Sequence, residues 1–300
     1  MSDQQPPNQN VKTIIFMVIL SFVCALILSL LASALEEPKD IARELDRSKQ
    51  MMIAAKILDP QGHFLMPDEK GDFVPAKLEK GLLVPGKAED HASQSQLLEI
   101  YQKRIIPLLV DSKGNIKNFK ESGINEEDYT VNFKKTGYYR QPEKLIYKVL
   151  PSEANVNEKS PPAAWVIPIN GFGLWDAIYG YLALKPDGNT VLGTAWYEHK
   201  ETPGLGASIA EPYWQELFPN KKVFQENADG TTDFKSAPLG IVVVKGKVSE
   251  VLGSSPKAKS AVDGMTGATL TGNGVTDAYR EVLGPYRPFL IKLHDENKKS

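Results

Sequence analysis

Residues 263–275 have the sequence DGMTGATLTGNGV, and this stretch carries the strongest structural and chemical signal in the chain. Small residues at positions 267 and 268 leave the side chain of Thr269 open to approach, and glycines at positions 272 and 274 let the main chain come close to a ligand. A helix N-terminus beside exposed backbone N–H groups favours a bound anion. The segment therefore predicts a hydroxyl group presented for phosphate chemistry. The alternative is a threonine-rich loop whose hydroxyl groups only cap a helix.

The residues that follow have helical periodicity. Apolar side chains occupy positions i, i+3, i+4 and i+7 of this repeat, namely Val275, Ala278, Tyr279 and Val282. This spacing predicts a helix with one buried face. The pair Gly284-Pro285 is a helix stop signal. We therefore expect the helix to follow the two glycines and to end at Gly284.

Composition and charge limit the possible functions. The chain has 300 residues with 42% hydrophobic content, which is enough to bury a core in one or two domains. A net charge of -2 gives no basic surface for a nucleic acid, so we expect no nucleic-acid partner. The only cysteine, Cys24, lies in an apolar run, and the four histidines are scattered along the chain. We therefore expect neither a catalytic thiol nor a metal site.

The apolar run from Thr13 to Leu35 contains no charged residue. At a rise of about 1.5 Å per residue, such a helix can cross a hydrocarbon core of about 30 Å. The alternative is a cleaved signal peptide, because Ala32-Ser33-Ala34 resembles a cleavage site. The run is too long for that, and Lys12 is the only basic residue before it. The sequence therefore favours an uncut anchor in the lipid bilayer.

The remaining sequence predicts a mixture of helices and strands, and therefore an α+β fold with a mixed or antiparallel sheet and flanking helices. Helices are expected over 37–58 and over 95–106, the second ended by Pro107. Residues 59–95 indicate turns between short strands, 111–115 a hairpin turn, and 118–160 a surface-rich insert with one short strand at 145–149. Further strands are expected at 165–169, 171–175 and 239–245, and a β-hairpin over 178–197 with its turn at 186–189.

The opening stretch resembles the flavinylation motif Asp-x-x-(Ser/Thr)-Gly-Ala-(Thr/Ser), and each fixed position matches. A second segment, ETPGLG at residues 201–206, precedes it along the chain. This pairing resembles the NqrC family, which are subunits of the sodium-translocating NADH:quinone oxidoreductases, and the related RnfG family of the Rnf complexes shares both elements. The segments GFGLWDAIYG at 171–180, PDGNT at 186–190 and AEPYW at 210–214 resemble the NqrC family more closely.

The resemblance implies an electron carrier whose FMN is joined to Thr269 by a phosphoester bond, made by a flavin transferase. It implies that a group of residues shapes the loop and positions hydrogen bonds to the phosphate: Asp263, Thr266, Gly267, Ala268, Leu270 and Thr271. It implies that Glu201, Thr202 and Leu205 line the flavin. Trp175 is a candidate wall of the flavin site, with plain core packing as the alternative, and Lys245 is a candidate for neutralising flavin charge. The protein itself supplies no catalytic residue, because the redox chemistry belongs to the cofactor.

The resemblance also implies the surroundings of the chain. Residues 1–12 are expected to form a tail, 13–35 a transmembrane helix, 36–160 the N-terminal part of an extracytoplasmic domain, and 161–300 the FMN-binding domain. Basic residues are more numerous after the apolar run than before it, which favours the opposite orientation, but large domains translocate largely regardless of charge. The implied location is the periplasmic side of the inner membrane, in a complex with other subunits. The alternatives are an Rnf-type carrier and a tethered binding module without cofactor.

Overall fold

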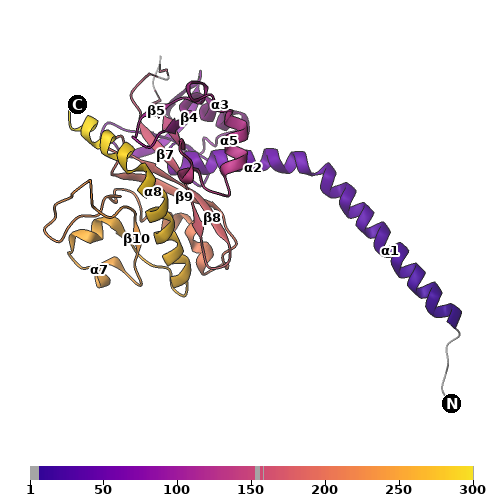
Figure 1. Cartoon of the computed structure of the whole chain (residues 1–300). Coiled ribbons are helices and arrows are strands. Elements are labelled where there is room, and N and C mark those ends of the chain that lie inside the picture. Colours follow the sequence, from indigo (N-terminus) through magenta and orange to yellow (C-terminus); the bar gives the residue numbers. More distant parts are fainter. Residues whose placement is uncertain (1–6, 153–155, 158, 300) are drawn as a thin grey trace. The chain divides into compact units, whose positions relative to one another are not determined.

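The apolar run forms α1, which extends from Pro7 to Ala34 (Figure 1). The structure is a computed structural model that describes residues 7–152, 156–157 and 159–299. Residues 10–34 are long and apolar enough to cross a membrane, by length and composition, and none of this span is buried. The apolar N-terminal helix predicted from the sequence is therefore confirmed. Of the tail predicted over 1–12, residues 1–6 lie outside the described residues, and residues 7–12 belong to α1.

The chain forms two compact units, residues 1–46 and 47–300. The next helix, α2, runs from Glu36 to Ala54. In the second unit its last turn is buried through Met51, Met52 and Ala54. The helix ends in a Schellman motif, in which Ile57 N donates to Met52 O at 2.9 Å.

A small antiparallel sheet follows, with strand order β1-β2-β3. Its strands are β1 (Phe64–Pro67), β2 (Phe73–Glu79) and β3 (Leu82–Pro85), as the turn-rich sequence predicts. The helix α3 then spans Gln94–Arg104 and begins with a capping box between Ser93 and Gln96.

Pro107 does not end α3, contrary to the sequence-based expectation. The helix stops at Arg104 and passes directly into β4 (Ile105–Val110), which contains the proline. The carbonyl group of Arg104 points toward β6, because it accepts a hydrogen bond from Leu150 N. Backbone groups of successive strand residues point to opposite sides, so the nitrogen of Pro107, three residues later, faces away from β6. On that other side β5 pairs only with Leu109 and Val110. The missing N–H group of Pro107 therefore costs the sheet no hydrogen bond.

The central feature is a six-stranded antiparallel sheet of order β5-β4-β6-β7-β8-β9. Besides β4 it contains β5 (Ile116–Lys117), β6 (Lys144–Val149), β7 (Ala164–Phe172), β8 (Ala177–Leu184) and β9 (Val191–Glu198). The predicted hairpin over 178–197 is confirmed as the β8–β9 pair. The sheet takes strands from both sides of residue 160.

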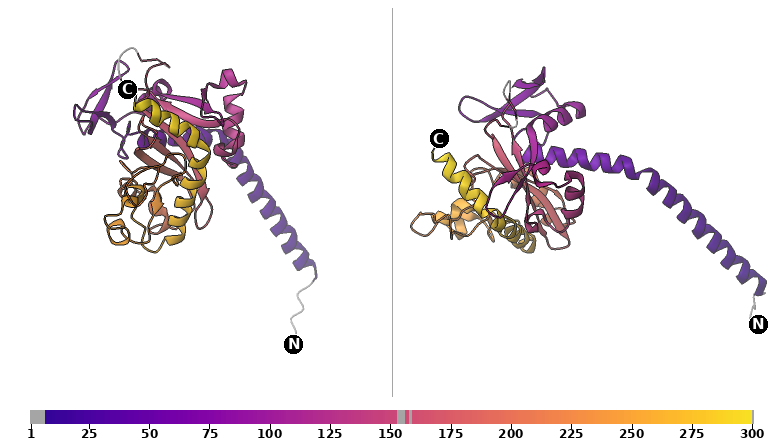
Figure 2. Two further views of the ribbon diagram at one scale, coloured as in Figure 1. Left: turned by 60° about the vertical axis from the view of Figure 1, so that its left-hand side comes forward. Right: turned by 45° about the horizontal axis from the view of Figure 1, so that its top comes forward.

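Both faces of this sheet are covered. In β7, Trp165, Ile167 and Ile169 belong to the core cluster formed with the C-terminal helix, whereas Ala164 and Val166 belong to the cluster formed with α2 and α3. This alternation follows from the two-residue period of a strand. Figure 2 shows the C-terminal helix lying across the sheet.

The polar segment from 118 to 143 forms α4 (Phe119–Ser122), α5 (Glu126–Phe133) and the 3-10 turn η1 (Tyr138–Arg140). These elements bury Phe119 and Tyr129 against Leu109 and Leu145. The short strand expected at 145–149 is confirmed as β6. It is an interior strand of the large sheet, so the description of 118–160 as a surface-rich insert is wrong for this strand.

Short elements follow β9, and they are η2 (Gly206–Ala210), α6 (Pro212–Gln215), α7 (Val248–Val251) and η3 (Pro256–Ser260). The strand expected over 239–245 is reduced to β10 (Val242–Val243), which pairs in parallel with β11 (Ala261–Val262). Residues before it are buried without a regular ladder: Gly240 N donates to Val223 O at 2.8 Å, and Leu239 makes an isolated bridge with Phe224. Burial, rather than pairing, explains this apolar run.

The C-terminal helix α8 spans Thr269–Asn297, so both predicted ends are wrong. Gly272 and Gly274 lie inside the helix, where the neighbouring chain comes too close for a larger residue. A Cβ on Gly272 would lie 3.0 Å from Val243 Cγ1, and a Cβ on Gly274 would lie 2.1 Å from Phe172 O. The helix also passes through Pro285 and Pro288. Both prolines are exposed, so water can reach the carbonyl groups that lose their partners. Beside them Tyr286, Phe289 and Leu290 are buried.

The β2–β3 turn offers a test of backbone strain. Lys80 has φ 51° and Gly81 has φ 79°, and hairpin turns with two positive φ angles favour Asn-Gly. We expect Lys80→Asn to raise the free energy of unfolding by about 0.5–1 kcal/mol, because asparagine tolerates the left-handed region better than lysine. Urea unfolding of the detergent-solubilised chain measures this. Lys70→Asn is the control, since Lys70 is an exposed turn residue without a positive φ, and equal midpoints for both variants would contradict the expectation.

Candidate functional site

The N-terminus of α8 has unsatisfied backbone donors. Ala268 is the N-cap residue and makes no side-chain capping bond, and Gly272 N, which donates to Ala268 O at 3.0 Å, makes the first helical bond. The N–H groups of Thr269, Leu270 and Thr271 therefore have no acceptor inside the helix. Such an end carries partial positive charge and favours an anion.

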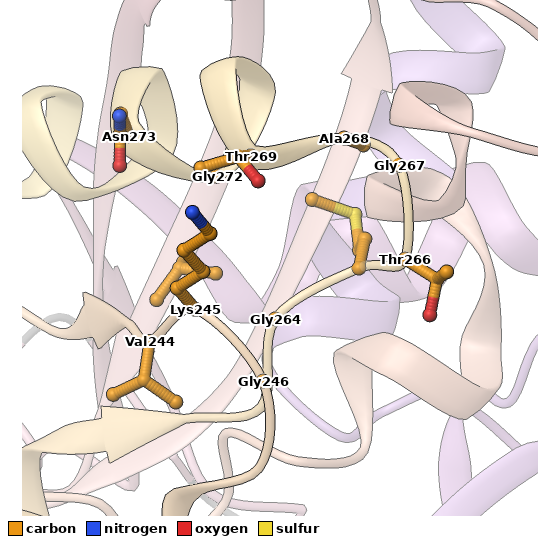
Figure 3. A pocket seen from close by; sticks show the side chains of 12 residues that line it. Val244, Lys245, Gly246, Gly264, Thr266, Gly267, Ala268, Thr269, Gly272 and Asn273 are labelled. Atoms are coloured by element: carbon orange, nitrogen blue, oxygen red, sulfur yellow. The ribbon is translucent and has the colours of Figure 1, made fainter. Parts of the chain in front are cut away.

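A cavity of about 220 Å³ opens beside this helix end (Figure 3). Its lining consists of residues 243–246, residues 264–269, Gly272 and Asn273. Figure 3 shows the Lys245 side chain extending toward the first turn of α8, where Thr269 and Asn273 lie. The cavity therefore combines an ammonium group with a helix N-terminus, and both attract the same sign of charge.

The loop before α8 leaves Thr269 accessible. Thr269 is exposed, whereas the neighbouring Ala268 is only 5% exposed. Gly267 has φ 75°, a conformation that L residues rarely adopt, and a Cβ there would lie 2.9 Å from Leu205 Cδ2. The small residues of the motif thus have two roles, because they allow a sharp bend and they admit Leu205 from a distant segment.

Glu201 joins three distant segments of the chain. Its side chain is buried, accepts a hydrogen bond from Trp175 N at 3.1 Å, and accepts another from Thr271 Oγ1. A Cβ on Gly173 or on Gly206 would lie 2.4 Å and 2.7 Å from its two carboxylate oxygens. The segments around 173–175, 201–206 and 267–271 therefore meet in space at Glu201.

The structure brings only part of the predicted set into the cavity. Thr266, Gly267, Ala268, Thr269 and Lys245 line it. The other predicted residues lie outside its lining: Asp263, Leu270, Thr271, Glu201, Thr202, Leu205 and Trp175. Thr271 is bonded to Glu201 instead of facing the cavity.

Several of the residues outside the cavity form an exposed apolar surface next to it. Trp175 is 67% exposed, so it is not part of the core, and its Nε1 donates to Thr202 Oγ1 at 3.0 Å. Leu174, Leu205 and Leu270 are also exposed. A flat aromatic ligand at the cavity would find apolar contacts on this side.

Sequence reasoning missed some of the cavity residues. Asn273 lies four residues after Thr269, which is one helical turn, so it would have been found if α8 had been predicted to start at Thr269. Val243 and Val244 come from a separate segment and carry no local signal. The four remaining residues are Gly246, Gly264, Met265 and Gly272.

The imidazole of His199 lies two residues before the buried Glu201. His199 Nδ1 accepts from Glu201 N at 3.2 Å, and burial lowers the pKa of this imidazole, so the ring is neutral at pH 7. Among the described residues, no three His, Cys, Asp or Glu side chains come together in a way that could hold a metal ion. The arrangement can hold an anion in the cavity and a flat ring beside it.

Comparison with known proteins decides the family. Residues 173–284 match the FMN-binding domain family. Over its full length the chain is 40% identical to the NqrC subunit of the Na⁺-translocating NADH-quinone reductase of Chlamydia caviae, and the match covers 98% of that protein. The chain belongs to the NqrC family of Na⁺-translocating NADH-quinone reductase subunits. The choice between an NqrC chain and an Rnf-type chain is thereby made in favour of NqrC.

More distant relatives carry the same name. The chain is 30% identical to the NqrC protein of Haemophilus ducreyi, over 94% of this chain and 93% of that protein. Among solved structures it is similar to Shewanella oneidensis NqrC, with 26% identity, a TM-score of 0.47 and coverage of 70% of this chain and 91% of that one. It is also similar to the NqrC protein of Parabacteroides distasonis, with 22% identity, a TM-score of 0.49 and coverage of 82% and 92%.

The Glu201–Thr271 contact in this NqrC-family chain can be tested by removing one hydroxyl group. Thr271→Val keeps the shape of the side chain but leaves the buried carboxylate of Glu201 short of a donor. We expect the free energy of unfolding to fall by about 1–3 kcal/mol. Thr271→Ser, which keeps the donor, should recover most of it. Urea unfolding of the detergent-solubilised chain is the measurement, and a valine variant as stable as the serine variant would contradict this account.

Proposed function

We propose that this chain is an electron carrier that relays electrons toward quinone through FMN joined to Thr269 by a phosphoester bond. The observation that carries the proposal is the position of Thr269, an exposed hydroxyl on the first residue of an uncapped 29-residue helix, beside a cavity that contains Lys245. The family of the chain and the FMN-binding domain match over 173–284 support the choice of cofactor.

The residues present fit a phosphate group at this place. The N–H groups at the start of α8 and the ammonium group of Lys245 would bind its oxygens, and Gly267 and Gly272 keep side chains out of its way. Thr266, Ala268 and Asn273 would complete the wall. On the outer side, Leu205 and Trp175 offer apolar surface, and Thr202 offers a polar atom for an edge of the ring.

Bound FMN supplies the ability to accept and donate electrons, and the protein supplies position and electrostatics. A flavin transferase would form the bond between Thr269 Oγ1 and the flavin-bearing phosphorus, with loss of the hydroxyl proton and of the donor's leaving group. The covalent bond removes the dependence of occupancy on free cofactor concentration, which otherwise follows mass action. This matters for a domain outside the cytoplasm, where free FMN is scarce.

The proposal includes the location of the chain. We place α1 in the inner membrane as a single-pass anchor and the globular unit on the periplasmic side. The described residues contain one helix that could span a membrane, and one such helix cannot build an ion path, so we assign sodium transport to other subunits of the complex.

Removal of the attachment hydroxyl tests the proposal directly. The full chain is produced together with an active flavin transferase and run on a denaturing gel. We expect a fluorescent flavin band for the wild type and for Thr136→Ala, an exposed threonine outside the cavity lining, and no band for Thr269→Ala. Mass spectrometry of the intact chain should show a mass above that of the unmodified chain by one FMN minus one water. A wild-type chain with unmodified mass would refute the proposal.

The contact of Leu205 with the ring is tested by a redox titration. Leu205→Ala should leave attachment intact and raise the flavin potential by a few tens of millivolts, because water that reaches the ring stabilises its charged reduced form. Val131→Ala, at an exposed valine on α5, is the control. An unchanged potential in the leucine variant would show that Leu205 does not pack on the ring.

A further inference from the structure

Asp263 opens the attachment loop, yet its carboxylate is engaged away from the cavity. Oδ1 accepts a hydrogen bond from Val248 N at 2.7 Å, and Val248 is the first residue of α7. Asp263 is half-buried and is absent from the cavity lining, whereas the next residue, Gly264, belongs to it. A carboxylate aimed at a phosphate would repel it. The observed contact keeps this negative charge out of the place where the anion would bind.

The backbone around Asp263 is held by three further bonds. Its carbonyl group accepts from Trp214 Nε1 at 3.0 Å, and Trp214 is buried in the core. Gly264 N donates to Gly246 O at 2.8 Å. Val244 N donates to Val262 O at 3.0 Å. Residues 262–264 are therefore fastened both to the core and to residues 244–248.

These two segments are opposite walls of the same cavity. Residues 243–246 carry Lys245, and residues 264–269 carry Thr269. The backbone bonds at Val244 and Gly246 set the walls on the N-terminal side of Lys247, and the Asp263 side chain fixes the chain again at Val248. Backbone bonds at Val244 and Gly246 thus hold Lys245 on both sides, and the Asp263 side chain adds a third attachment two residues further on. Loss of the side-chain bond would leave the Gly246–Gly264 bond as the last attachment on the C-terminal side of Lys245.

We propose that Asp263 is a positioning residue for flavin attachment, which holds the segment carrying Lys245 against the loop carrying Thr269. This inference rests on the proposed function, because attachment at Thr269 is the process that it serves. The bond to Val248 N requires a hydrogen-bond acceptor at position 263, whether or not that acceptor is charged. On this inference the acid of the motif acts inside this chain, through Val248.

The acceptor can be separated from the charge by three variants. Asp263→Ala removes the acceptor. Asp263→Asn keeps an oxygen that can accept from Val248 N and removes the charge. Val248→Pro removes the donor and leaves Asp263 untouched, and a proline is tolerated there because Val248 is the first helical residue and Lys247 before it is extended, with ψ 141°.

The initial rate of flavin attachment is measured on the purified full chain with an active transferase and its flavin donor, by in-gel fluorescence. We expect Asp263→Ala and Val248→Pro to slow attachment about tenfold, and Asp263→Asn to stay within about twofold of the wild type. The double variant Asp263→Ala/Val248→Pro should be no slower than either single variant, because both remove one interaction.

A control outside the site corrects for general loss of stability. In the β1–β2 turn, Asp68 Oδ1 accepts from Lys70 N at 2.8 Å and from Asp72 N at 2.9 Å. Asp68→Ala therefore removes bonds from backbone N–H groups to an aspartate, as Asp263→Ala does, but at a residue far along the chain from the cavity. Its attachment rate should equal that of the wild type. Circular dichroism reports whether each variant folds. If Asp263→Ala does not fold, the comparison of Asp263→Asn with Val248→Pro decides the question.

Two patterns would overturn the inference. If Asp263→Asn is as slow as Asp263→Ala while Val248→Pro is normal, then the negative charge itself is recognised. If all three single variants attach flavin at the wild-type rate, the contact has no role in attachment. A wild-type chain that gains no flavin is a different result, because it refutes attachment at Thr269 and with it the proposed function.

Discussion

The hydrogen bond between Thr271 and the buried carboxylate of Glu201 is the contact on which the site depends. It joins the first turn of α8 to the segment after β9, and through Trp175 N it also holds the turn between β7 and β8. A buried carboxylate is costly unless it is hydrogen-bonded, so these donors are needed for the fold as well as for the site. The contact brings Leu205 against Gly267, and it thereby places an apolar surface beside the exposed hydroxyl of Thr269.

The long helix α8 connects this site to the core. One of its faces is buried over most of its length against the six-stranded sheet, and Tyr286 near its middle donates to Leu145 O at 2.7 Å. The helix therefore cannot shift along the sheet without loss of packing and of this bond. Its N-terminus lacks a side-chain cap, so its free N–H groups remain available to a ligand. A rigid core thus fixes the direction of an anion-binding helix end.

The sequence predicts the parts of this molecule that depend on local patterns. The β8–β9 hairpin follows from alternation and turn residues, and the apolar face of α8 follows from its helical spacing. The predicted ends of α8 are wrong because Gly272 and Pro285 are local signals, whereas the packing of Gly272 on Val243 and the burial of Tyr286 are tertiary effects that override them.

The site itself follows the same division. The three segments that meet at Glu201 carry recognisable motifs, so the family resemblance assigns residues of all three to the site. Lys245 in the opposite wall is predicted from the family resemblance, but its neighbours Val243 and Val244 are not, because they carry no motif of their own. The contact made by Asp263 could not be predicted either, because its partner Val248 is identified only by the fold.

The distribution of charge explains how such an open site can serve a redox cofactor. The two carboxylates of the motifs are withdrawn, Glu201 into the interior and Asp263 onto Val248, and the positive groups of Lys245 and the helix end remain at the cavity. A cavity of about 220 Å³ encloses a phosphate group but leaves a three-ring system largely uncovered. Non-covalent binding by so little enclosure would be weak, since affinity for a flat ligand comes mostly from buried surface. An uncovered ring edge, however, is what a partner protein needs for electron exchange. On the proposed function, a covalent bond at Thr269 therefore removes the conflict between retention of the flavin and access to it.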